Sequence, residues 1–408
     1  MRKIILIGAG QSGLQLGHGL LEKGYDVTIV TDRTAQEVHD GSIMSSQVMF
    51  HPCLQTERDL GLNFWDEECP FMKTLSVTGV GPDGSALIDW TCSLGDGPSQ
   101  SLDQRVKFPV WMNKFEERGG KLIIHEATIE DAEGYAEESD LLLVATGKGA
   151  LGRLFQRDPS RSPFDKPQRN LLLLFVNGMI PRDDDATGGL SVIPGVGEYL
   201  CFRALTTTGE CAIMLFEAAM DGPMDDWKSC STLDEHIDKA KSLLGAFLPW
   251  EAERCKNITP TDPNAILRGA FPPTVKTPLA TLPSGATSLG IGDAVVLNDP
   301  VTGRGANGAA MAASIYLRRI LEHTDHDFTP EWMTQTFEDF YDWAQWGVRF
   351  TNVQLGVPPA PHIIQILMTA QENEAVKQAF VNGFNNPETT FPWIEDPAET
   401  QKFIDQHS

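Results

Sequence analysis

The chain has 408 residues, a length that usually divides among more than one hydrophobic core. It contains 32 Lys and Arg against 56 Asp and Glu, so the formal net charge is −24, and no basic block interrupts the acidity. This charge argues against nucleic acid and against an anionic membrane surface as partners. No apolar run approaches the ~20 residues that span a bilayer.

Seven cysteines are scattered along the chain without a C-x-x-C spacing. Their number and placing suggest neither a disulfide framework nor a zinc site, so no metal is expected. The N-terminal apolar stretch runs directly into a glycine loop and is interpreted as a strand, not as a signal peptide. A reducing cytoplasm is the expected compartment.

The first predicted element is a strand over residues 3–7, followed by a GxGxxG loop. Gly8 would make the tight turn, Gly10 would let the backbone approach a pyrophosphate, and Gly13 would let the next helix pack closely. The helix N-terminus favours bound phosphate, and Ser12 is a candidate phosphate donor. The cofactor residues predicted in this loop are Gly8, Gly10, Gln11, Ser12 and Gly13.

The loop opens a helix predicted over residues 14–21, and a second strand is predicted over 26–31. That strand ends in Asp32, where the dinucleotide fingerprint has its ribose-binding acid, and Arg33 follows. A dinucleotide site is therefore predicted at this first βαβ unit.

A polar stretch then leads into residues 41–50. In an extended conformation, Ser45, Gln47 and Met49 share one face, because side chains alternate along a strand.

The strands predicted downstream are a 74–90 hairpin, 121–125, 141–145, 171–176, 199–205, 212–217 and 289–291. The helices predicted are 54–62, 102–117, 233–247, 309–321, 330–353, 362–371 and 374–384. Consecutive strands after residue 170 indicate an antiparallel sheet inserted into an α/β fold.

Two later segments look as though they join the glycine loop at one dinucleotide. The first is Thr146–Gly147, at the end of a predicted strand. The second runs from Gly292 to Asn307 and resembles the GD motif and P-x-x-G-x-G-x-N loop of flavoprotein monooxygenases related to p-hydroxybenzoate hydroxylase. The resemblance implies that Asp293 meets the ribityl chain and that the loop lies along the isoalloxazine edge. The residues it marks are Gly292, Asp293, Pro300, Gly303, Gly305, Ala306 and Asn307.

Nearly the whole chain, from about residue 3 to 387, resembles the oxygenase component of two-component styrene and indole monooxygenases. The matching motifs are Thr31-Asp32-Arg33, Asp103-Gln104-Arg105, Thr146-Gly147-Lys148, Asp299-Pro300-Val301, Phe350-Thr351-Asn352 and the run of residues 162–169, Ser-Pro-Phe-Asp-Lys-Pro-Gln-Arg. At the start of its helix, Arg105 would reach the pyrophosphate as a charge-assisted donor. The implied fold is a Rossmann-like FAD-binding domain (1–70, 100–160 and 270–325), a mostly antiparallel substrate domain (71–99 and 161–269) and C-terminal helices (326–408).

The resemblance also implies an activity. The enzyme would take FADH2 from a separate NADH-dependent flavin reductase and react it with O2 to a C4a-hydroperoxyflavin. It would then transfer one oxygen atom to a small aromatic substrate inside a dry, apolar pocket. Indole would be epoxidised at C2–C3, leading to indigo, and styrenes and aryl sulfides would be accepted as well. A homodimer is one possible assembly.

Pocket residues distinguish the two types within this family. Styrene-type members carry Asn, Val and His on the pocket strand, whereas indole-type members carry Ser, Gln and Met. This chain has Ser45, Gln47 and Met49, which resembles the indole type. Met72 and Leu75 occupy places where that type has smaller aliphatics, and Ser99 is the styrene-like residue.

Three functions stay open at this point. The chain is a two-component monooxygenase of the indole or styrene type, a single-component hydroxylase that binds NAD(P)H itself, or a non-catalytic flavin-binding protein. No second GxGxxG is present, which favours an external source of electrons. Single-component hydroxylases of the same fold also lack a second GxGxxG motif, so this absence does not separate the first two functions. The family resemblance favours the two-component monooxygenase.

Overall fold

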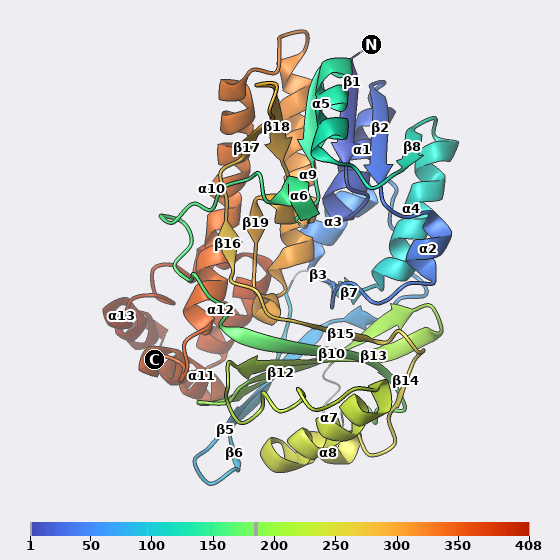
Figure 1. The fold of residues 1–408 in the computed structure, drawn as a ribbon. Coiled ribbons are helices and arrows are strands. Elements are labelled where there is room, and N and C mark those ends of the chain that lie inside the picture. Colours follow the sequence, from blue (N-terminus) through green and yellow to red (C-terminus); the bar gives the residue numbers. More distant parts are fainter. Residues whose placement is uncertain (1, 96, 148, 183–186, 408) are drawn as a thin grey trace.

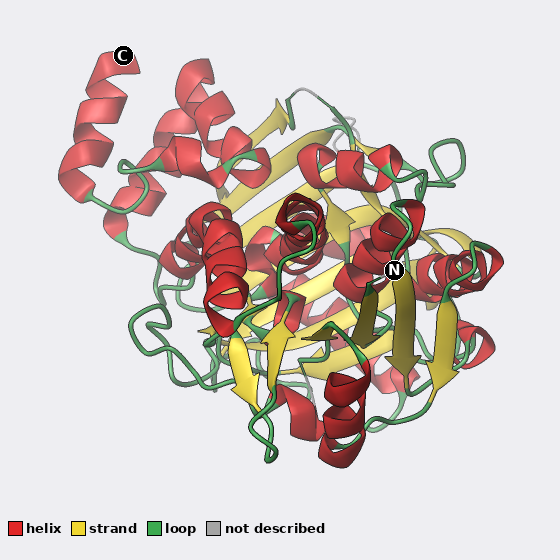
Figure 2. Cartoon of the chain, turned by 90° about the horizontal axis from the view of Figure 1, so that it is seen from above, coloured by secondary structure: helices red, strands yellow, loops and turns green. Residues whose placement is uncertain are grey.

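The computed structural model describes residues 2–95, 97–147, 149–182 and 187–407. Lys148, which belongs to one of the motifs named above, lies outside the described residues. Figure 1 shows two large sheets, one above the other, with the C-terminal helices along one side of both. Figure 2, from above, shows the last of these helices gathered away from the N-terminus.

Within the described part, six strands form the upper sheet in the order β17-β18-β9-β1-β2-β8. All neighbouring strands are parallel except β17 and β18, which are antiparallel. The strands are β1 (Lys3–Ile7), β2 (Asp26–Thr31), β8 (Lys121–Ile124), β9 (Leu141–Val144), β17 (Leu279–Thr281) and β18 (Thr287–Gly290).

Helices cover both faces of this sheet. α1 (Gln11–Glu22), α4 (Gln104–Glu117) and α9 (Arg304–His323) pack on one face, and α5 (Ile129–Glu138) packs against β1 and β9 from the other. Because both faces are covered, β1 and β9 are nearly continuous runs of buried Ile, Leu and Val. Because β2 and β9 both pair with β1 in parallel, the carboxyl ends of these three strands lie at one edge of the sheet.

The lower sheet is mostly antiparallel, and among the described residues it has eight strands. Their order is β14-β10-β13-β12-β11-β5-β6, with β15 beside β10 and a parallel pair of β11 and β5. The strands are β5 (Thr74–Val80), β6 (Ala86–Ser93), β10 (Arg169–Asn177), β11 (Gly188–Ile193), β12 (Gly197–Thr206), β13 (Gly209–Ala219), β14 (Thr259–Pro260) and β15 (Ile266–Gly269).

The two faces of the lower sheet have different neighbours. α7 (Leu233–Phe247) packs on one face with a core of its own, and α8 (Pro249–Arg254) follows it. The other face packs against α11 (Pro361–Glu372) and α12 (Glu374–Asn385). The second face is the one that meets the cofactor loop described below.

Short elements connect the two sheets. β3 (Val48–Met49), β7 (Ser99–Ser101) and β4 (Phe71–Met72) form a three-stranded sheet between them, and β16 (Thr274–Val275) pairs with β19 (Val296–Leu297). The remaining helices are α2 (Ala35–His39), α3 (His51–Asp59), α6 (Gly149–Gly152), α10 (Pro330–Gln354), α13 (Pro397–His407) and the 3-10 turns η1 (Gly292–Ala294), η2 (Pro300–Thr302) and η3 (Pro387–Thr390).

The predicted fold class is confirmed: a Rossmann-like α/β part is combined with a mostly antiparallel sheet and C-terminal helices. β2 and α7 have the predicted bounds, whereas α5 and β11 were not predicted from the sequence. β11 begins with Gly188 and Gly189, and glycine has low strand propensity. The division into three domains stays a prediction.

Candidate functional site: three segments and an apolar cavity

The glycine loop has the geometry that its spacing predicts. Gly8 has φ 121°, a conformation that favours glycine, and a Cβ atom at Gly13 would lie 2.0 Å from the carbonyl oxygen of Gly8. A Cβ atom at Gly10 would meet nothing within 4 Å. Gly10 is also the N-cap of α1 and makes no side-chain cap, so the first N–H groups of this helix are open to a ligand.

The three predicted segments meet at this loop. A Cβ atom at Gly8 would lie 3.1 Å from the backbone of Ala145, directly before Thr146. A Cβ atom at Gly147 would lie 2.9 Å from the carbonyl oxygen of Asp293, and one at Gly292 would lie 2.7 Å from Ser12 Oγ. Glycine is therefore favoured at 147 by close backbone approach and at 292 by its φ of 63°, and residues far apart in sequence form one edge.

Acidic side chains stand at both ends of this edge. Asp32 is exposed at the end of β2, with Arg33 Nε 3.6 Å from its carboxylate. Asp293 is exposed in η1 beside the glycine loop. Exposed carboxylates at these two places suit the hydroxyl groups of a ribose and a ribityl chain, which donate hydrogen bonds.

The loop before α9 presents a second helix N-terminus. Asp299 Oδ1 accepts from Val301 N–H and caps η2, and Gly303 has φ 66°, a left-handed conformation. α9 then starts without a side-chain cap, and a Cβ atom at Gly305 would meet nothing within 4 Å. A flat ring can lie against this backbone, and Ala306 is half-buried next to it.

Asn307 joins this loop to strand β3. Its Oδ1 accepts from Phe50 N–H at 2.8 Å, and its Nδ2 donates to the carbonyl oxygen of Val48 at 2.7 Å. The side-chain amide thus bonds β3 as a neighbouring strand would. The segment that carries the predicted pocket residues is fixed directly to the predicted cofactor loop.

Arg105 is already held by two carboxylates. Its Nη2 lies 2.8 Å from Asp103 and 2.9 Å from Asp262, and the guanidinium is 2% exposed. Its Nη2 also donates to Thr206 Oγ1. The role of Arg105 at the pyrophosphate stays a prediction, and it requires the guanidinium to exchange one of these partners.

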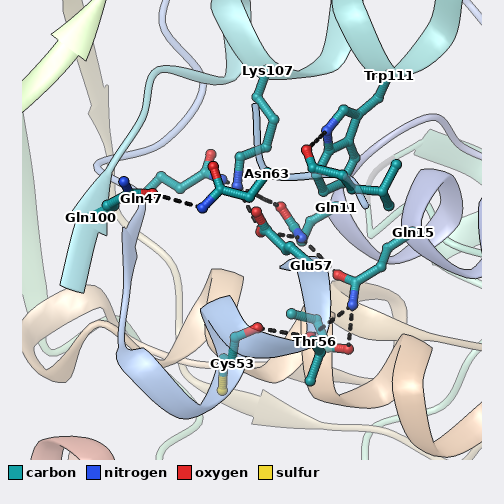
Figure 3. A network of polar contacts seen from close by, with 12 residues as sticks. Gln11, Gln15, Gln47, Cys53, Thr56, Glu57, Asn63, Gln100, Lys107 and Trp111 are labelled. Atoms are coloured by element: carbon teal, nitrogen blue, oxygen red, sulfur yellow. Dashed lines mark hydrogen bonds and ion pairs between the residues drawn. The ribbon is translucent and has the colours of Figure 1, made fainter. Parts of the chain in front are cut away.

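A buried polar network lies behind the glycine loop (Figure 3), and its ion pair was not predicted from the sequence. Lys107 of α4 and Glu57 of α3 are each 1% exposed, with Lys107 Nζ 2.7 Å from Glu57 Oε1. Gln11 Nε2 donates to the same Glu57 oxygen at 2.9 Å, and Gln47 Nε2 donates to Gln11 Oε1 at 3.3 Å. Gln15 connects the network to the backbone of α9 at Ala310.

The expectation of an extended segment through residues 45–49 is wrong. β3 covers only Val48–Met49, and Gln47 has φ 33°, with its N–H donating to Ser45 Oγ. This turn directs Gln47 into the polar network, while Met49 packs with Cys53, Leu54 and Ala310. The Gln47 Oε1 atom is buried without a hydrogen-bond partner, so an acceptor for a ligand N–H or O–H is available there.

An apolar cavity of about 40 Å³ lies on the other side of β3. It is lined by Ser46, Val48 and Phe50 from the β3 segment, by Met72 and Leu75, and by Pro300 to Gly303 of the cofactor loop. Leu200, Phe202 and Leu215 of the lower sheet and Phe384 of α12 complete most of the wall. Of the six predicted pocket residues, the structure places Met72 and Leu75 in this lining, but not Ser45, Gln47, Met49 or Ser99. Ser99 is buried and pairs with Met72 in the small sheet.

The residues present fit a bound FAD. Two uncapped helix N-termini, two open glycines and an unpartnered acceptor at Gln47 lie along the edge where the three segments meet. Among the described residues, no group of three or more His, Cys, Asp or Glu side chains could hold a metal ion. In the same residues, no helix is long and apolar enough to cross a membrane.

Two solved structures with a similar fold are described as flavin- or FAD-dependent enzymes. The flavin-dependent brominase Bmp2 superposes with a TM-score of 0.63 at 14% identity, covering 99% of this chain and 98% of that one. PqsL, a probable FAD-dependent monooxygenase from Pseudomonas aeruginosa, gives a TM-score of 0.63 at 15% identity over 93% of this chain and 99% of that one. The fold is thus that of the FAD-dependent monooxygenases.

Sequence comparison defines the family within this class. Residues 147–254 match a family model described as the styrene monooxygenase A putative substrate binding domain. Styrene monooxygenase StyA from Pseudomonas sp. is 30% identical over 415 residues, covering 99% of this chain and 98% of the relative. StyA from Pseudomonas fluorescens is also 30% identical, over 100% of this chain and 98% of its own length. The chain belongs to the styrene monooxygenase family and is a flavin-dependent monooxygenase, which implies FAD as cofactor and O2 as co-substrate.

Proposed function

We propose that this chain is the oxygenase component of a two-component monooxygenase that epoxidises an electron-rich C=C bond next to an aromatic ring. Reduced FAD comes from a separate NADH-dependent flavin reductase. Indole, attacked at C2–C3 and leading to indigo, is the proposed preferred substrate, with styrene epoxidation and aryl sulfide sulfoxidation as further activities. The observation that carries the proposal is the apolar cavity against the Pro300–Thr302 turn of the cofactor loop.

The bound flavin supplies the oxygen-transfer chemistry, and the side chains of this chain bind, orient and exclude water. The open backbone at Gly10 and at Gly305 gives the cofactor room at two helix N-termini. The Oε1 atom of Gln47 accepts a hydrogen bond from the cofactor. The apolar wall keeps water from the reacting atoms.

The cavity also bears on the substrate. Its volume of about 40 Å³ holds only a few water molecules, so a bicyclic ring enters only when lining side chains move. Met72 and Leu75 have flexible side chains that permit this. The Ser46 hydroxyl in the lining is the proposed acceptor for the indole N–H.

The reaction test combines the purified chain with a generic NADH-dependent flavin reductase, FAD, O2 and either indole, styrene or thioanisole. We expect indigo, styrene oxide and the sulfoxide, with the highest turnover on indole, and no NADH oxidation by the chain alone. NADH oxidation by the chain alone, stimulated by substrate, would instead favour a single-component hydroxylase. Absence of every oxygenated product would reject the proposal.

Substituting Val48→Phe tests the cavity as the substrate site. The larger side chain occupies the space that the substrate needs, so kcat/KM should fall about tenfold for indole and styrene alike, at a stability cost of about 1–3 kcal/mol. FAD affinity should not change.

A triple variant, Ser45→Asn with Gln47→Val and Met49→His, tests the side chains of this segment that lie outside the cavity lining. If these side chains contact the substrate, the styrene-to-indole ratio rises. An unchanged ratio together with reduced FAD affinity would assign Gln47 to the cofactor and reject the three residues as specificity determinants.

A further inference from the structure

Four ionisable side chains are buried together at one end of the cavity. They are Arg169 of β10, Glu198 of β12, Glu217 of β13 and Asp299 of the cofactor loop, with exposed fractions of 1%, 4%, 0% and 1%. Glu198 and Glu217 are direct cross-strand neighbours. Their strands alternate so that Leu200 and Leu215, two residues away, line the cavity on the same face. Asp299 directly precedes Pro300, which also lines it.

Arg169 forms a bidentate ion pair with Glu198. Its Nε donates to Glu198 Oε2 at 2.6 Å, and its Nη2 donates to Glu198 Oε1 at 2.9 Å. Its Nη1 donates to the carbonyl oxygens of Gln168 and Leu355. This bidentate pair balances one positive charge with one negative charge and leaves the other two carboxyl groups to each other.

Glu217 and Asp299 must share a proton. Neither oxygen of Glu217 accepts a hydrogen bond from an N–H or O–H donor, and both are buried. Among the groups that act on Glu217, the carboxyl group of Asp299 has the strongest effect, and two buried carboxyl groups can bond to each other only if one of them is protonated. Asp299 Oδ1 already accepts from Val301 N–H, which favours the charged form of Asp299 and leaves the proton on Glu217.

The titration of the pair agrees with this assignment. Burial, followed by the charge of Asp299, raises the pKa of Glu217 well above its usual range, and Glu198 adds to the effect while Arg169 opposes it. Burial also raises the pKa of Asp299, whereas the bonds from Glu217 and from Val301 N–H lower it. These are the charged groups that face Glu217 from β10, β12 and the cofactor loop.

We infer that Glu217 is a positioning residue for oxygen transfer: its neutral carboxylic acid donates a hydrogen bond to Asp299 and so holds the Pro300–Thr302 turn as a fixed wall of the substrate cavity. The inference rests on the proposed function only in that this wall faces the substrate. Above the pKa of Glu217 two adjacent carboxylates would repel each other, and the turn would shift away from the sheet. A shifted turn admits water, so NADH oxidised through the reductase would yield hydrogen peroxide in place of epoxide.

Two variants test whether the hydrogen bond that Glu217 donates, and not only the size of its side chain, is needed for coupling. Glu217→Gln keeps a neutral donor and should retain wild-type coupling of NADH oxidation to product near neutral pH. Glu217→Leu removes the donor, so coupling should fall about fivefold, the value of one lost hydrogen bond, while FAD affinity stays unchanged. Wild-type coupling in Glu217→Leu would overturn the inference.

The pH profile distinguishes a proton-dependent role from a merely structural one. A carboxyl group whose pKa is raised in the folded state stabilises below its unfolded pKa, and this stabilisation is lost as the pH rises through the folded pKa. Coupling of the wild type should therefore decline at alkaline pH, and Glu217→Gln and Asp299→Asn should not show this decline. Glu251→Gln is the matched control, because Glu251 of α8 is also buried but pairs with Arg254 away from the cavity. An alkaline decline in Glu217→Gln equal to that of the wild type would contradict the inference.

Thermal unfolding tests the inference even if the chain oxygenates none of the three substrates. The melting temperature of Glu217→Gln relative to the wild type should increase as the pH rises, and that of Glu251→Gln should not. An unchanged difference across the pH range would show that Glu217 does not hold a proton in the folded state.

Discussion

Replacing Lys107 by Met is expected to lower the free energy of unfolding by about 3–5 kcal/mol. Lys107 Nζ lies 2.7 Å from Glu57 Oε1, and both side chains are 1% exposed, so the substitution leaves a buried carboxylate without its counter-charge. Gln11 of the glycine loop also bonds to this carboxylate, so the effect should reach the cofactor edge. Urea denaturation followed by circular dichroism gives the stability, and titration with FAD gives the affinity.

The control for this prediction is the double variant Lys107→Met with Glu57→Gln. A neutral amide at position 57 removes the uncompensated charge and still accepts from Gln11, so most of the lost stability should return. If the single and the double variant are equally unstable, packing of the lysine stem and not its charge is what stabilises this region.

Substituting Gly10→Val should weaken cofactor binding about 100-fold without affecting the fold. Gly10 has φ −90° and ψ −167°, an extended conformation that valine adopts, and a Cβ atom there would meet nothing within 4 Å. The side chain would fill the space predicted for the pyrophosphate. Losing one charge-assisted hydrogen bond can cost about 2.7 kcal/mol, so FAD affinity should fall about 100-fold while the melting temperature stays near that of the wild type.

Gly134→Val is the matched control for this substitution. Gly134 lies in α5, where a Cβ atom also meets nothing within 4 Å, so the same side chain is added far from the glycine loop. FAD affinity should be unchanged in this variant. Unchanged FAD affinity in Gly10→Val would show that the pyrophosphate does not lie over this loop.

Some of this architecture follows from local patterns. The β1–α1–β2 unit could be predicted because an apolar run, glycines at fixed spacing and a second apolar run are each encoded within a few residues. The meeting of Gly147 with Asp293 was predictable only through the family resemblance, since close backbone approach leaves no periodic signal. FAD binding at this edge stays a prediction for the individual residues.

The side chains around β3 could not be predicted in the same way. A left-handed turn at Gln47 decides in which directions the side chains of Ser46 and Gln47 point. The backbone nearby is also held by Asn307, which lies 257 residues from Phe50 and 259 residues from Val48 in the sequence. A strand of two residues is too short to show the alternation of buried and exposed side chains from which a strand can be predicted. The Lys107–Glu57 pair likewise joins two helices 50 residues apart in sequence.

The amide of Asn307 has a consequence for how specificity in this protein could be changed. Because it bonds only to the backbone of Val48 and Phe50, this anchor of the chain does not depend on the side chains of these two residues. Positions 46, 48 and 50 can therefore be exchanged to reshape the hollow while the distance from that hollow to the cofactor loop stays the same. Libraries that vary these three positions and keep Asn307 should yield altered substrate ranges far more often than they yield inactive proteins.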